Sequence, residues 1–513
     1  MFRKPSPATV LAVVAFGVFV AADDLTVVST MLRQIIYDLN IPLPDGLDKA
    51  AWIVNAYLIA YVAVMPFVGR LSDVVGRRAV YVGSLVLFLA GSIWVPLAAD
   101  LNGFIVGRVL TALGGGAMVP VAMAVIGDVY ERKQRATAMG TLGAIDTAGW
   151  VWGPLYGALL VRFLSWRWQF YLNIPLSLIG IAAAWWALRD LPRPVKRERI
   201  DWLGTGMLTI SLLVLNIALL NSGDVQSAGG FASLEESANA VIWPFYLLAA
   251  IAFVVFILWQ RRLSRNTNYL FTSATAGRPP LHPLINLRLF RKRNFNTAVL
   301  INFLVGGILI IAMVNVPLVI NVLEVDVQQA ALVSGYLLSG MTGAMAILAY
   351  VGGRLTERFS YRPVTLAGLA LCAVGFGLMG SSWAVGTPTR QMAWQLAVLG
   401  AGFGLVIAPV GTAVINTAPD NQRGIASSLV IVVRLMGMSV GLSALTAWGL
   451  RRFEVLRTQI MLPDLPFSDP IYQKAIVDGL TEVTVRVLTE TFVVTAVIAL
   501  IALLVSLRLQ SDS

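Results

Sequence analysis

Five ionisable side chains interrupt the long apolar runs of this sequence. They are Asp23, Asp24, Arg108, Asp146 and Arg434. At the centre of a lipid bilayer such a charge costs about 2.5–3.5 kcal/mol on insertion scales, so charges inside a membrane usually mark function. A carboxylate removed from water holds its proton more tightly, and a guanidinium beside it favours proton release. These residue types therefore indicate proton coupling, and the alternative is a set of static ion pairs that fix helix register.

The composition indicates that lipid surrounds most of this chain. Of its 513 residues, 58% are hydrophobic and 13% are charged, whereas soluble proteins carry about 25% charged residues. This balance excludes an ordinary soluble enzyme and a disordered chain. A membrane helix needs about 20 apolar residues. The apolar runs therefore predict an all-α membrane protein with fourteen spans, at 8–31, 50–69, 79–98, 102–126, 136–160, 168–188, 202–220, 241–260, 296–319, 331–351, 364–383, 392–415, 425–449 and 489–507.

The loop charges predict how the chain is oriented. Of the 38 Lys and Arg residues, 26 lie in loops on the side of the N-terminus, 10 lie in loops on the opposite side, and two lie within spans. Because basic loops stay in the cytoplasm, both termini are expected there, in a multi-pass protein of a bacterial inner membrane. The same bias accounts for the net charge of +11 without a nucleic-acid partner. The loop 261–295 is the most basic and is expected to contact anionic membrane lipids.

Depth in the membrane groups the buried charges into two pairs. At about 1.5 Å of rise per residue, Asp24 and Arg108 both lie about 9–10 Å from the outer ends of their spans. Asp146 and Arg434 both lie about 14–15 Å from the inner ends of theirs. We therefore predict an outer pair, Asp24–Arg108, and a midplane pair, Asp146–Arg434, as the proton-coupling residues. Asp23 is expected to face an aqueous vestibule.

The sequence contains an internal repeat. Gly69–Arg78 recurs as Gly353–Arg362, and further Gly and Pro positions recur at nearly the same offset, between 284 and 289 residues. Near-equal offsets predict two homologous six-helix bundles in the same orientation, which is the layout of an alternating-access transporter. The domains are expected at 1–190 and 296–513, with a two-helix insert and its basic loops at 191–295.

The turn between the second and third spans carries charges that can pair. Asp73 and Arg77 are four residues apart and form an ion pair if the turn is helical. Such groups can lock two bundles together and release them. Because this stretch has a counterpart at 353–362, we predict a cytoplasmic gate; the alternative is a solvated loop. The residues expected to form the gate are Gly69, Asp73, Gly76, Arg77 and Arg78.

The fifth predicted span is rich in glycine. Gly149, Gly153 and Gly157 permit close helix contact, and Pro154 interrupts the backbone hydrogen bonds. The alternative is generic packing of membrane helices. The candidates for a substrate cavity, which could equally face lipid, are Tyr57, Trp150 and Trp152. With one cysteine and one histidine in the chain, no metal site is expected, and the proton gradient takes the place of a cofactor.

Several of these motifs together resemble the major facilitator superfamily. Gly69–Asp73 with Gly76–Arg78 is similar to the signature loop of that superfamily. The stretch from Gly140 to Gly157 resembles its antiporter motif. Asp24–Val28 is similar to the acidic first-span motif of its 14-span drug:proton antiporter branch. The resemblance covers nearly the whole chain.

Within that branch, Trp52–Arg78 and Gly424–Phe453 resemble the mycobacterial exporters of drugs and triacylglycerides. The resemblance implies proton-driven export through the first-span acid, a gate that includes Asp128, and a lipid-carrying lipoprotein as a partner. One departure concerns the fifth span, where those exporters have a glutamate and this chain has Thr147 beside Asp146. One residue turns about 100° around a helix, so the resemblance does not carry over to the midplane pair.

The sequence thus predicts a proton-driven antiporter that exports lipophilic or amphipathic compounds of multidrug type by alternating access. The alternative is an exporter of lipids, such as triacylglycerides or glycolipids, that works with a periplasmic lipoprotein; both cargoes need an apolar cavity. The external segment 450–488 is either the docking site of such a carrier or a solvated loop. A remote alternative is a membrane-embedded hydrolase, since Gly437–Gly441 matches G-x-S-x-G, but this stretch lies within a predicted helix.

Overall fold

The computed structural model describes residues 5–39, 47–191, 201–221, 243–270, 284, 287–324, 327–460, 466 and 469–510. In this part of the chain every long element is an α-helix, and no strand is present. The helices of the first half are α1 (Pro7–Asp38), α2 (Leu47–Val75), α3 (Arg77–Trp94), α4 (Leu101–Val129), α5 (Arg135–Phe163) and α6 (Arg167–Ala187). The next two are α7 (Trp202–Asn221) and α9 (Trp243–Leu270). Those of the second half are α10 (Arg293–Leu323), α11 (Val327–Phe359), α12 (Tyr361–Ser382), α13 (Thr389–Thr417), α14 (Arg423–Arg457) and α15 (Pro470–Ser506).

Within the described residues, 12 of these helices are long and apolar enough to cross a membrane. One of the two others is α5, whose sequence includes polar residues such as Asp146 and Thr147. The other is α7, in which Trp202–Leu215 is the apolar stretch whose side chains are all described. The structure therefore confirms the all-helical fold and 12 of the predicted spans. For α5 and α7, crossing the membrane stays a prediction.

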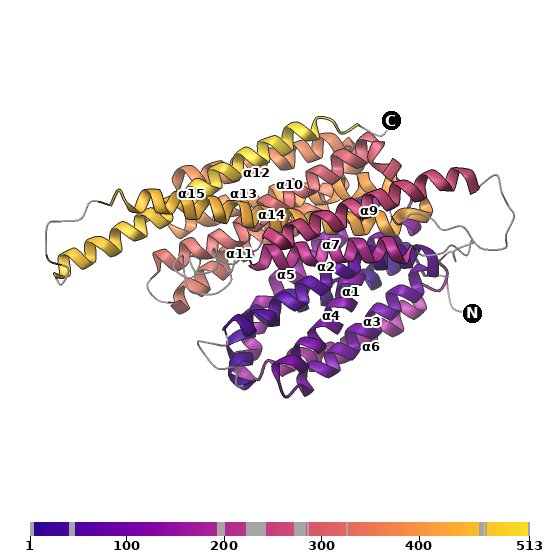
Figure 1. Ribbon diagram of the computed structural model, residues 1–513, viewed down its shortest axis with the longest axis horizontal. Coiled ribbons are helices and arrows are strands. Elements are labelled where there is room, and N and C mark those ends of the chain that lie inside the picture. Colours follow the sequence, from indigo (N-terminus) through magenta and orange to yellow (C-terminus); the bar gives the residue numbers. More distant parts are fainter. Residues whose placement is uncertain are drawn as a thin grey trace.

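The helices form two groups that meet through two crossed pairs (Figure 1). Helices α1–α6 pack on one another, α10–α15 do the same, and α7 packs on α2 and α9. The groups meet where α2 contacts α14 and where α5 contacts α11. The second helix of each group thus contacts the fifth helix of the other, as expected for two repeats in the same orientation. The domain boundaries after residues 190 and 295 stay predictions.

The two groups touch at one end and separate at the other. At the end where α2 finishes and α14 begins, which we call the closed end, a Cβ atom on Gly69 would lie 2.5 Å from the carbonyl oxygen of Gly424. Only glycine permits so close an approach of two backbones. At the opposite end, which we call the open end, Leu332 and Tyr336 near the start of α11 are 76% and 67% exposed. Figure 1 shows the two groups diverging toward the end where α15 begins.

Helices α14 and α15 are longer than the sequence predicts. The segment 450–488 is expected to be an external loop, but α14 continues to Arg457 and α15 begins at Pro470. The two helices are joined here by Arg452, whose Nε and Nη2 lie 2.7 and 3.2 Å from the carboxylate oxygens of Glu490. Arginine and glutamate are good helix formers. They can therefore continue a helix beyond the point where the apolar sequence ends. The prediction of a loop is therefore wrong for most of this segment, because hydropathy does not detect a polar continuation of a membrane helix.

The turns before α3 and before α12 share an unusual backbone conformation. Gly76 has φ 109° and ψ 145°. Ser360, which stands 284 residues later, has φ 68° and ψ 179°. Glycine adopts such angles readily, whereas another residue loses about 1–3 kcal/mol. The Ser360 side chain makes no capping hydrogen bond that would offset this loss.

Substituting Ser360→Gly should therefore raise the melting temperature of the chain. The gain should be about 1 kcal/mol, because the larger entropy of glycine in the unfolded chain offsets part of the relieved strain. Thermal unfolding in detergent, followed by tryptophan fluorescence, measures it. The matched reverse change, Gly76→Ser, should lower the melting temperature. A Ser360→Gly variant that melts below the wild type would contradict this account of the turn.

Candidate functional site

A buried ion pair joins α1 and α4. Arg108 Nη1 lies 2.7 Å from Asp24 Oδ2, and the two side chains are 1% and 0% exposed. Arg108 Nη2 also donates to the backbone carbonyl of Asp24 at 3.3 Å. On α6, Asn173 Nδ2 donates to Asp24 Oδ1 at 3.2 Å. The structure thus brings together the two residues that the sequence matches by depth, and both oxygens of the carboxylate have partners.

The Arg108 guanidinium lies over the ring of Tyr57 on α2. Arg108 Cζ is 4.0 Å from the ring centroid, a cation–π contact that strengthens when water is excluded. Tyr57 in turn stacks on Tyr61, with ring centroids 5.7 Å apart. The sequence places Tyr57 in a substrate cavity, but the structure buries it beneath the ion pair. Through this ring, α2 is in direct contact with the Asp24–Arg108 pair.

A second ion pair crosses between the two helix groups. Arg434 Nη2 on α14 lies 4.0 Å from Asp146 Oδ2 on α5, and both side chains are largely buried. The neighbouring hydroxyl of Thr147 donates instead to the carbonyl of Gly143 within α5, at 2.8 Å. The structure therefore brings the predicted midplane pair together at the limit of ion-pair distance. Asp146 stands one residue before the position of the glutamate in the exporters that the sequence resembles, and it still lies beside Arg434.

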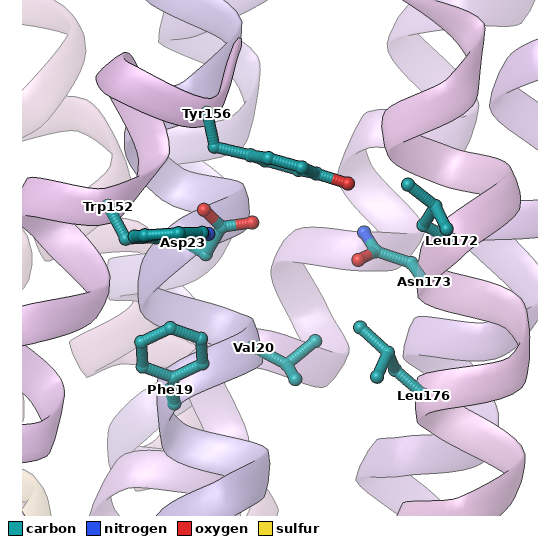
Figure 2. A pocket seen from close by; sticks show the side chains of 8 residues that line it. All are labelled: Phe19, Val20, Asp23, Trp152, Tyr156, Leu172, Asn173 and Leu176. Atoms are coloured by element: carbon teal, nitrogen blue, oxygen red, sulfur yellow. The ribbon is translucent and has the colours of Figure 1, made fainter. Parts of the chain in front are cut away.

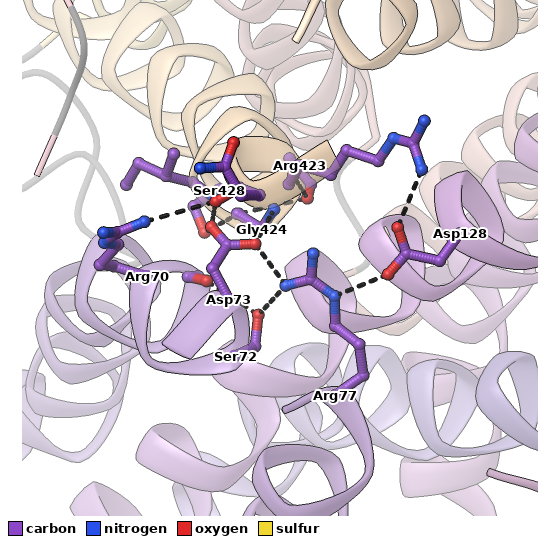
Figure 3. A network of polar contacts seen from close by, with 12 residues as sticks. Arg70, Ser72, Asp73, Arg77, Asp128, Arg423, Gly424 and Ser428 are labelled. Atoms are coloured by element: carbon purple, nitrogen blue, oxygen red, sulfur yellow. Dashed lines mark hydrogen bonds and ion pairs between the residues drawn. The ribbon is translucent and has the colours of Figure 1, made fainter. Parts of the chain in front are cut away.

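At the closed end, the Asp73 carboxylate caps α14. Its Oδ1 accepts from the backbone N–H of Gly424 at 2.9 Å, and its Oδ2 accepts from that of Ile425 at 3.2 Å. Arg77 Nη1 lies 2.6 Å from Oδ1. A carboxylate at a helix N-terminus satisfies free N–H groups and interacts favourably with the helix dipole. Asp73 thus holds α2 against the first turn of α14 (Figure 3).

The Asp128 carboxylate bridges two arginines from different helix groups. Its Oδ2 accepts from Arg77 Nε, and its Oδ1 accepts from Arg423 Nη1, each at 3.0 Å. Asp128 lies at the end of α4 and Arg423 begins α14, so this bridge also spans the closed end (Figure 3). Arg78, which is expected in the same gate, lies apart from it. Its guanidinium carbon is 4.0 Å from the ring centroid of Trp185 on α6.

A second junction at the closed end joins α11 and α13 to α5. Glu357 Oε1 accepts from the backbone N–H of Thr137, in the first turn of α5, at 3.0 Å. Arg135 Nη1 donates to Asn416 Oδ1 at 2.8 Å. Asn416 Nδ2 donates to the hydroxyl of Tyr361 at 2.5 Å. The sequence analysis predicts a repeat in this region but none of these contacts.

The repeat offsets contain the signal that would have revealed this second junction. Glu357 and Tyr361 stand 284 residues after Asp73 and Arg77. Asn416 stands 288 residues after Asp128. Both junctions therefore use equivalent positions, with a carboxylate on the N-terminus of the fifth helix of the other group. The second junction has an asparagine and a tyrosine where the first has an aspartate and an arginine, so it carries less charge.

The glycines of α5 bring this helix close to α1. A Cβ atom on Gly149, Gly153 or Gly157 would lie under 3.0 Å from atoms of α1. The carbonyl oxygen of Trp150 accepts from Thr26 Oγ1 of α1 at 3.3 Å, which belongs to the same contact. Only residues without a side chain permit this packing. Pro154 lies in the same helix, and its side chain is outside the described part of the chain.

Trp152 lines a cavity of about 170 Å³ between α1, α5 and α6 (Figure 2). Asp23 lines the same cavity, and most of the other lining side chains are apolar. The structure thus places Asp23 in the wall of a small, mostly apolar cavity, and its access to water stays a prediction. Of the three predicted cavity residues, the structure places Trp152 alone in the lining of this cavity.

The described residues contain neither a metal cluster nor the geometry of a hydrolase. No group of three His, Cys, Asp or Glu side chains among them could hold a metal ion. The single histidine, His282, lies outside the described residues. The stretch Gly437–Gly441 lies inside α14 and packs on α10, where a Cβ atom on Gly441 would lie 2.6 Å from the Cα of Gly307. This stretch lacks the strand–turn–helix that a G-x-S-x-G nucleophile requires.

Comparison with known proteins shows similarity to transporters over most of the chain. The sequence pattern of the Major Facilitator Superfamily matches residues 14–222 and 225–442. A triacylglyceride transporter of Mycolicibacterium hassiacum is 32% identical over 489 residues, which cover 92% of this chain and 85% of that protein. A triacylglyceride transporter of Mycobacterium tuberculosis is 31% identical over 515 residues, which cover 96% of this chain and 93% of that protein.

Two solved structures have a similar fold. The proton:xylose symporter XylE, solved with 6-bromo-6-deoxy-D-glucose, aligns with a TM-score of 0.63 at 13% identity and covers 98% of this chain and 96% of XylE. The human organic anion transporter TETRAN aligns with a TM-score of 0.58 at 13% identity, over 98% of this chain and 100% of that chain. At such low identity these structures show the fold alone.

Removing one partner of the buried Asp24–Arg108 pair should destabilise the chain. In Asp24→Asn, the Arg108 charge stays buried without its counter-ion, a situation that costs about 3–5 kcal/mol in other proteins. The melting temperature in detergent should therefore fall. The double variant Asp24→Asn/Arg108→Gln removes both charges and should regain most of the loss. Equal melting temperatures for the single variant and the wild type would show that the pair is not buried as described.

The Asp73→Asn change should loosen the closed end. A neutral amide loses the ion pair with Arg77 and accepts more weakly from backbone N–H groups. Spin labels on cysteines introduced at Glu131 and Asn421, in a Cys372→Ser background, report the distance between the two groups. We expect a longer mean distance in Asp73→Asn than in the wild type.

The matched variant for the second junction is Glu357→Gln. Because Glu357 accepts a single backbone hydrogen bond there, this change should lengthen the distance less than Asp73→Asn does. A distance distribution that Asp73→Asn leaves unchanged would mean that the carboxylate does not hold the closed end together.

Proposed function

Because this chain belongs to the Major Facilitator Superfamily and is a transporter rather than an enzyme, we propose that it exports neutral lipids of the triacylglyceride class. The observation that carries the proposal is the similarity to relatives named triacylglyceride transporters, which match 92% and 96% of the chain. These names favour lipid over the compounds of multidrug type that the sequence puts first.

The described conformation corresponds in this proposal to one half of an alternating-access cycle. Contacts of Asp73 and Asp128 join the helix groups at the closed end, and the groups are apart at the open end. The excess of basic loop residues assigns the closed end and both termini to the cytoplasm of a bacterial inner membrane. The open end then faces outward. On this assignment α5 and α7 also cross the membrane, which completes the fourteen spans.

Proton binding at Asp24 is the proposed driving step. Protonation of this carboxylate removes its charge and with it the ion pair to Arg108. The freed guanidinium lies on the ring of Tyr57 in α2, and the same helix carries Asp73 at the closed end. A change at the ion pair is therefore proposed to reach the closed end along α2, which contains Pro66 between Tyr57 and Asp73. The Asp146–Arg434 pair, which joins α5 to α14, must separate when the groups move apart at mid-depth.

A lipoprotein in the periplasm is the proposed acceptor of the exported lipid. A triacylglyceride is insoluble in water, so it needs a carrier beyond the membrane. The open end is the place where such a carrier would receive it, and α14 and α15 extend there toward residues 457 and 470. The lipoprotein is proposed because the cargo is a water-insoluble lipid. A water-soluble cargo would need no such carrier.

Lipid export is tested with the purified chain in vesicles that contain a triacylglyceride with a fluorescent acyl chain. With a proton gradient imposed, we expect transfer of the lipid to acceptor vesicles to exceed the transfer from protein-free vesicles. Without the gradient, transfer should fall to the protein-free level. Ethidium transport in parallel vesicles tests the multidrug alternative.

The matched control is Asp190→Asn, which removes a half-exposed carboxylate at the end of α6, away from the two ion pairs. It should transfer lipid as the wild type does. Gradient-driven movement of ethidium with no movement of the triacylglyceride would overturn the lipid assignment in favour of a multidrug exporter.

A further inference from the structure

The cavity between α1, α5 and α6 contains a carboxylate that lacks a countercharge. Gln169 Nε2 donates to Asp23 Oδ2 at 2.9 Å, whereas Asp23 Oδ1 has no hydrogen-bond partner among the described residues. The Asp23 side chain is only 6% exposed and belongs to the lining of this cavity. Figure 2 shows the carboxylate beside the rings of α5, with side chains of α6 across the cavity. Besides Asp23, the lining includes Trp152 and Tyr156 of α5 and Leu172 and Asn173 of α6.

Asp23 differs in this respect from its neighbour Asp24. The Asp24 carboxylate is neutralised by Arg108 at 2.7 Å, but none of the residues that line the cavity around Asp23 is basic. A carboxylate buried among apolar side chains is costly unless it is paired and hydrogen-bonded. The cavity therefore favours a ligand that supplies both a positive charge and an N–H donor.

Two aromatic rings beside the carboxylate add a second preference for a cation. Trp152 and Tyr156 stack with centroids 6.1 Å apart and an interplanar angle of 18°. The face of an aromatic ring attracts a cation, and tryptophan does so most strongly. A carboxylate next to stacked rings is thus suited to an ammonium group.

The surface around the cavity indicates how a ligand reaches it. The Trp152 side chain in the wall is 52% exposed, so the cavity reaches the surface of the molecule between α5 and α6. Leu159 on α5 and Leu178 and Ile179 on α6 are also exposed on these helices. Such apolar surface is typical of helices that face lipid. A ligand therefore arrives from the bilayer and has an apolar part, and a cavity of about 170 Å³ accommodates its head group alone.

We propose that this cavity, which we call the amine pocket, binds single-chain amphiphiles with a protonated amine head group. The ammonium pairs with the Asp23 carboxylate and lies against the rings of Trp152 and Tyr156, and the alkyl chain extends into lipid between α5 and α6. The amine pocket is distinct from the Asp24–Arg108 pair but borders it, because Asn173 lines the cavity and donates to Asp24. This ligand class is cationic, so the proposal goes beyond export of neutral lipid and does not depend on it.

The test measures binding of dodecylamine to the chain in phosphatidylcholine nanodiscs. A dodecylamine with a photoreactive diazirine on its alkyl chain is cross-linked to the protein, and the labelled peptides are identified by mass spectrometry. We expect labelling of α5 and α6 next to the pocket. Unlabelled dodecylamine should compete about tenfold better than dodecanol at equal mole fraction in the bilayer, the effect of one charge-assisted hydrogen bond.

One variant tests the role of Asp23, a second tests the cavity itself, and a third serves as a control. Asp23→Asn should abolish the advantage of the amine over the alcohol. Leu172→Trp fills the cavity while keeping the carboxylate and should remove the labelling itself, so the test survives if Asp23→Asn does not fold. Asp190→Asn should behave as the wild type.

Equal competition by dodecylamine and dodecanol would overturn the proposal, because the site would then take alkyl chains irrespective of charge. Labelling that Leu172→Trp leaves unchanged would also overturn it, since the probe would then lie outside the pocket. No transport is measured in this assay, so its outcome is independent of whether the chain exports triacylglycerides.

Discussion

A charge buried among apolar helices must find a partner, and in the described part of this chain the partners of the buried carboxylates Asp24, Asp73 and Asp146 lie on other helices. Asp24 on α1 is paired with Arg108 on α4, and Asp73 on α2 is paired with the first turn of α14. An unpaired buried charge costs several kcal/mol, so these contacts determine which helices stay together. In the proposed cycle the same contacts act as switches, because protonation of a carboxylate or entry of water removes the need for the partner. Among the described residues, the Asp23 carboxylate accepts from the neutral Gln169 on α6 and has no countercharge, and it is where we place a cationic ligand.

The internal repeat explains where the two helix groups can be joined. Asp146 and Arg434 stand 288 residues apart, the same offset that relates Gly149 to Gly437. They therefore occupy equivalent positions in the two halves and meet between the groups. Two copies of one residue would place like charges together there, whereas an acid and a base can form an ion pair. The two halves must therefore differ at this position for the ion pair to form.

The same divergence distinguishes the two junctions at the closed end. One is held by a carboxylate between two arginines, and the other by an asparagine between an arginine and a tyrosine. Charge-assisted hydrogen bonds are about twice as strong as neutral ones. The junction of α2 with α14 therefore resists opening more than that of α5 with α11. In the proposed cycle, which opens and closes at this end, the stronger junction sets the energy that proton binding would have to supply.

Much of this architecture can be predicted from the sequence, since apolar runs locate helices and the rise per residue gives each charge a depth. That is how Asp24 was matched with Arg108. Depth does not determine which way a side chain turns around its helix axis. For this reason the sequence places Tyr57 in a cavity, whereas its ring lies under Arg108. The sequence does not predict the helical turns near Arg457 and Pro470, because hydropathy does not detect polar turns of a helix.

The central claim is that Asp24 binds the proton whose movement drives lipid export, and proton flux tests it most directly. A pH-sensitive dye inside vesicles that contain the reconstituted chain reports flux after a triacylglyceride is added to the bilayer. The account predicts flux that the lipid stimulates in the wild type and that is absent in Asp24→Asn/Arg108→Gln, in which no charge is left unpaired. Lipid-stimulated flux of wild-type size in that double variant would contradict it.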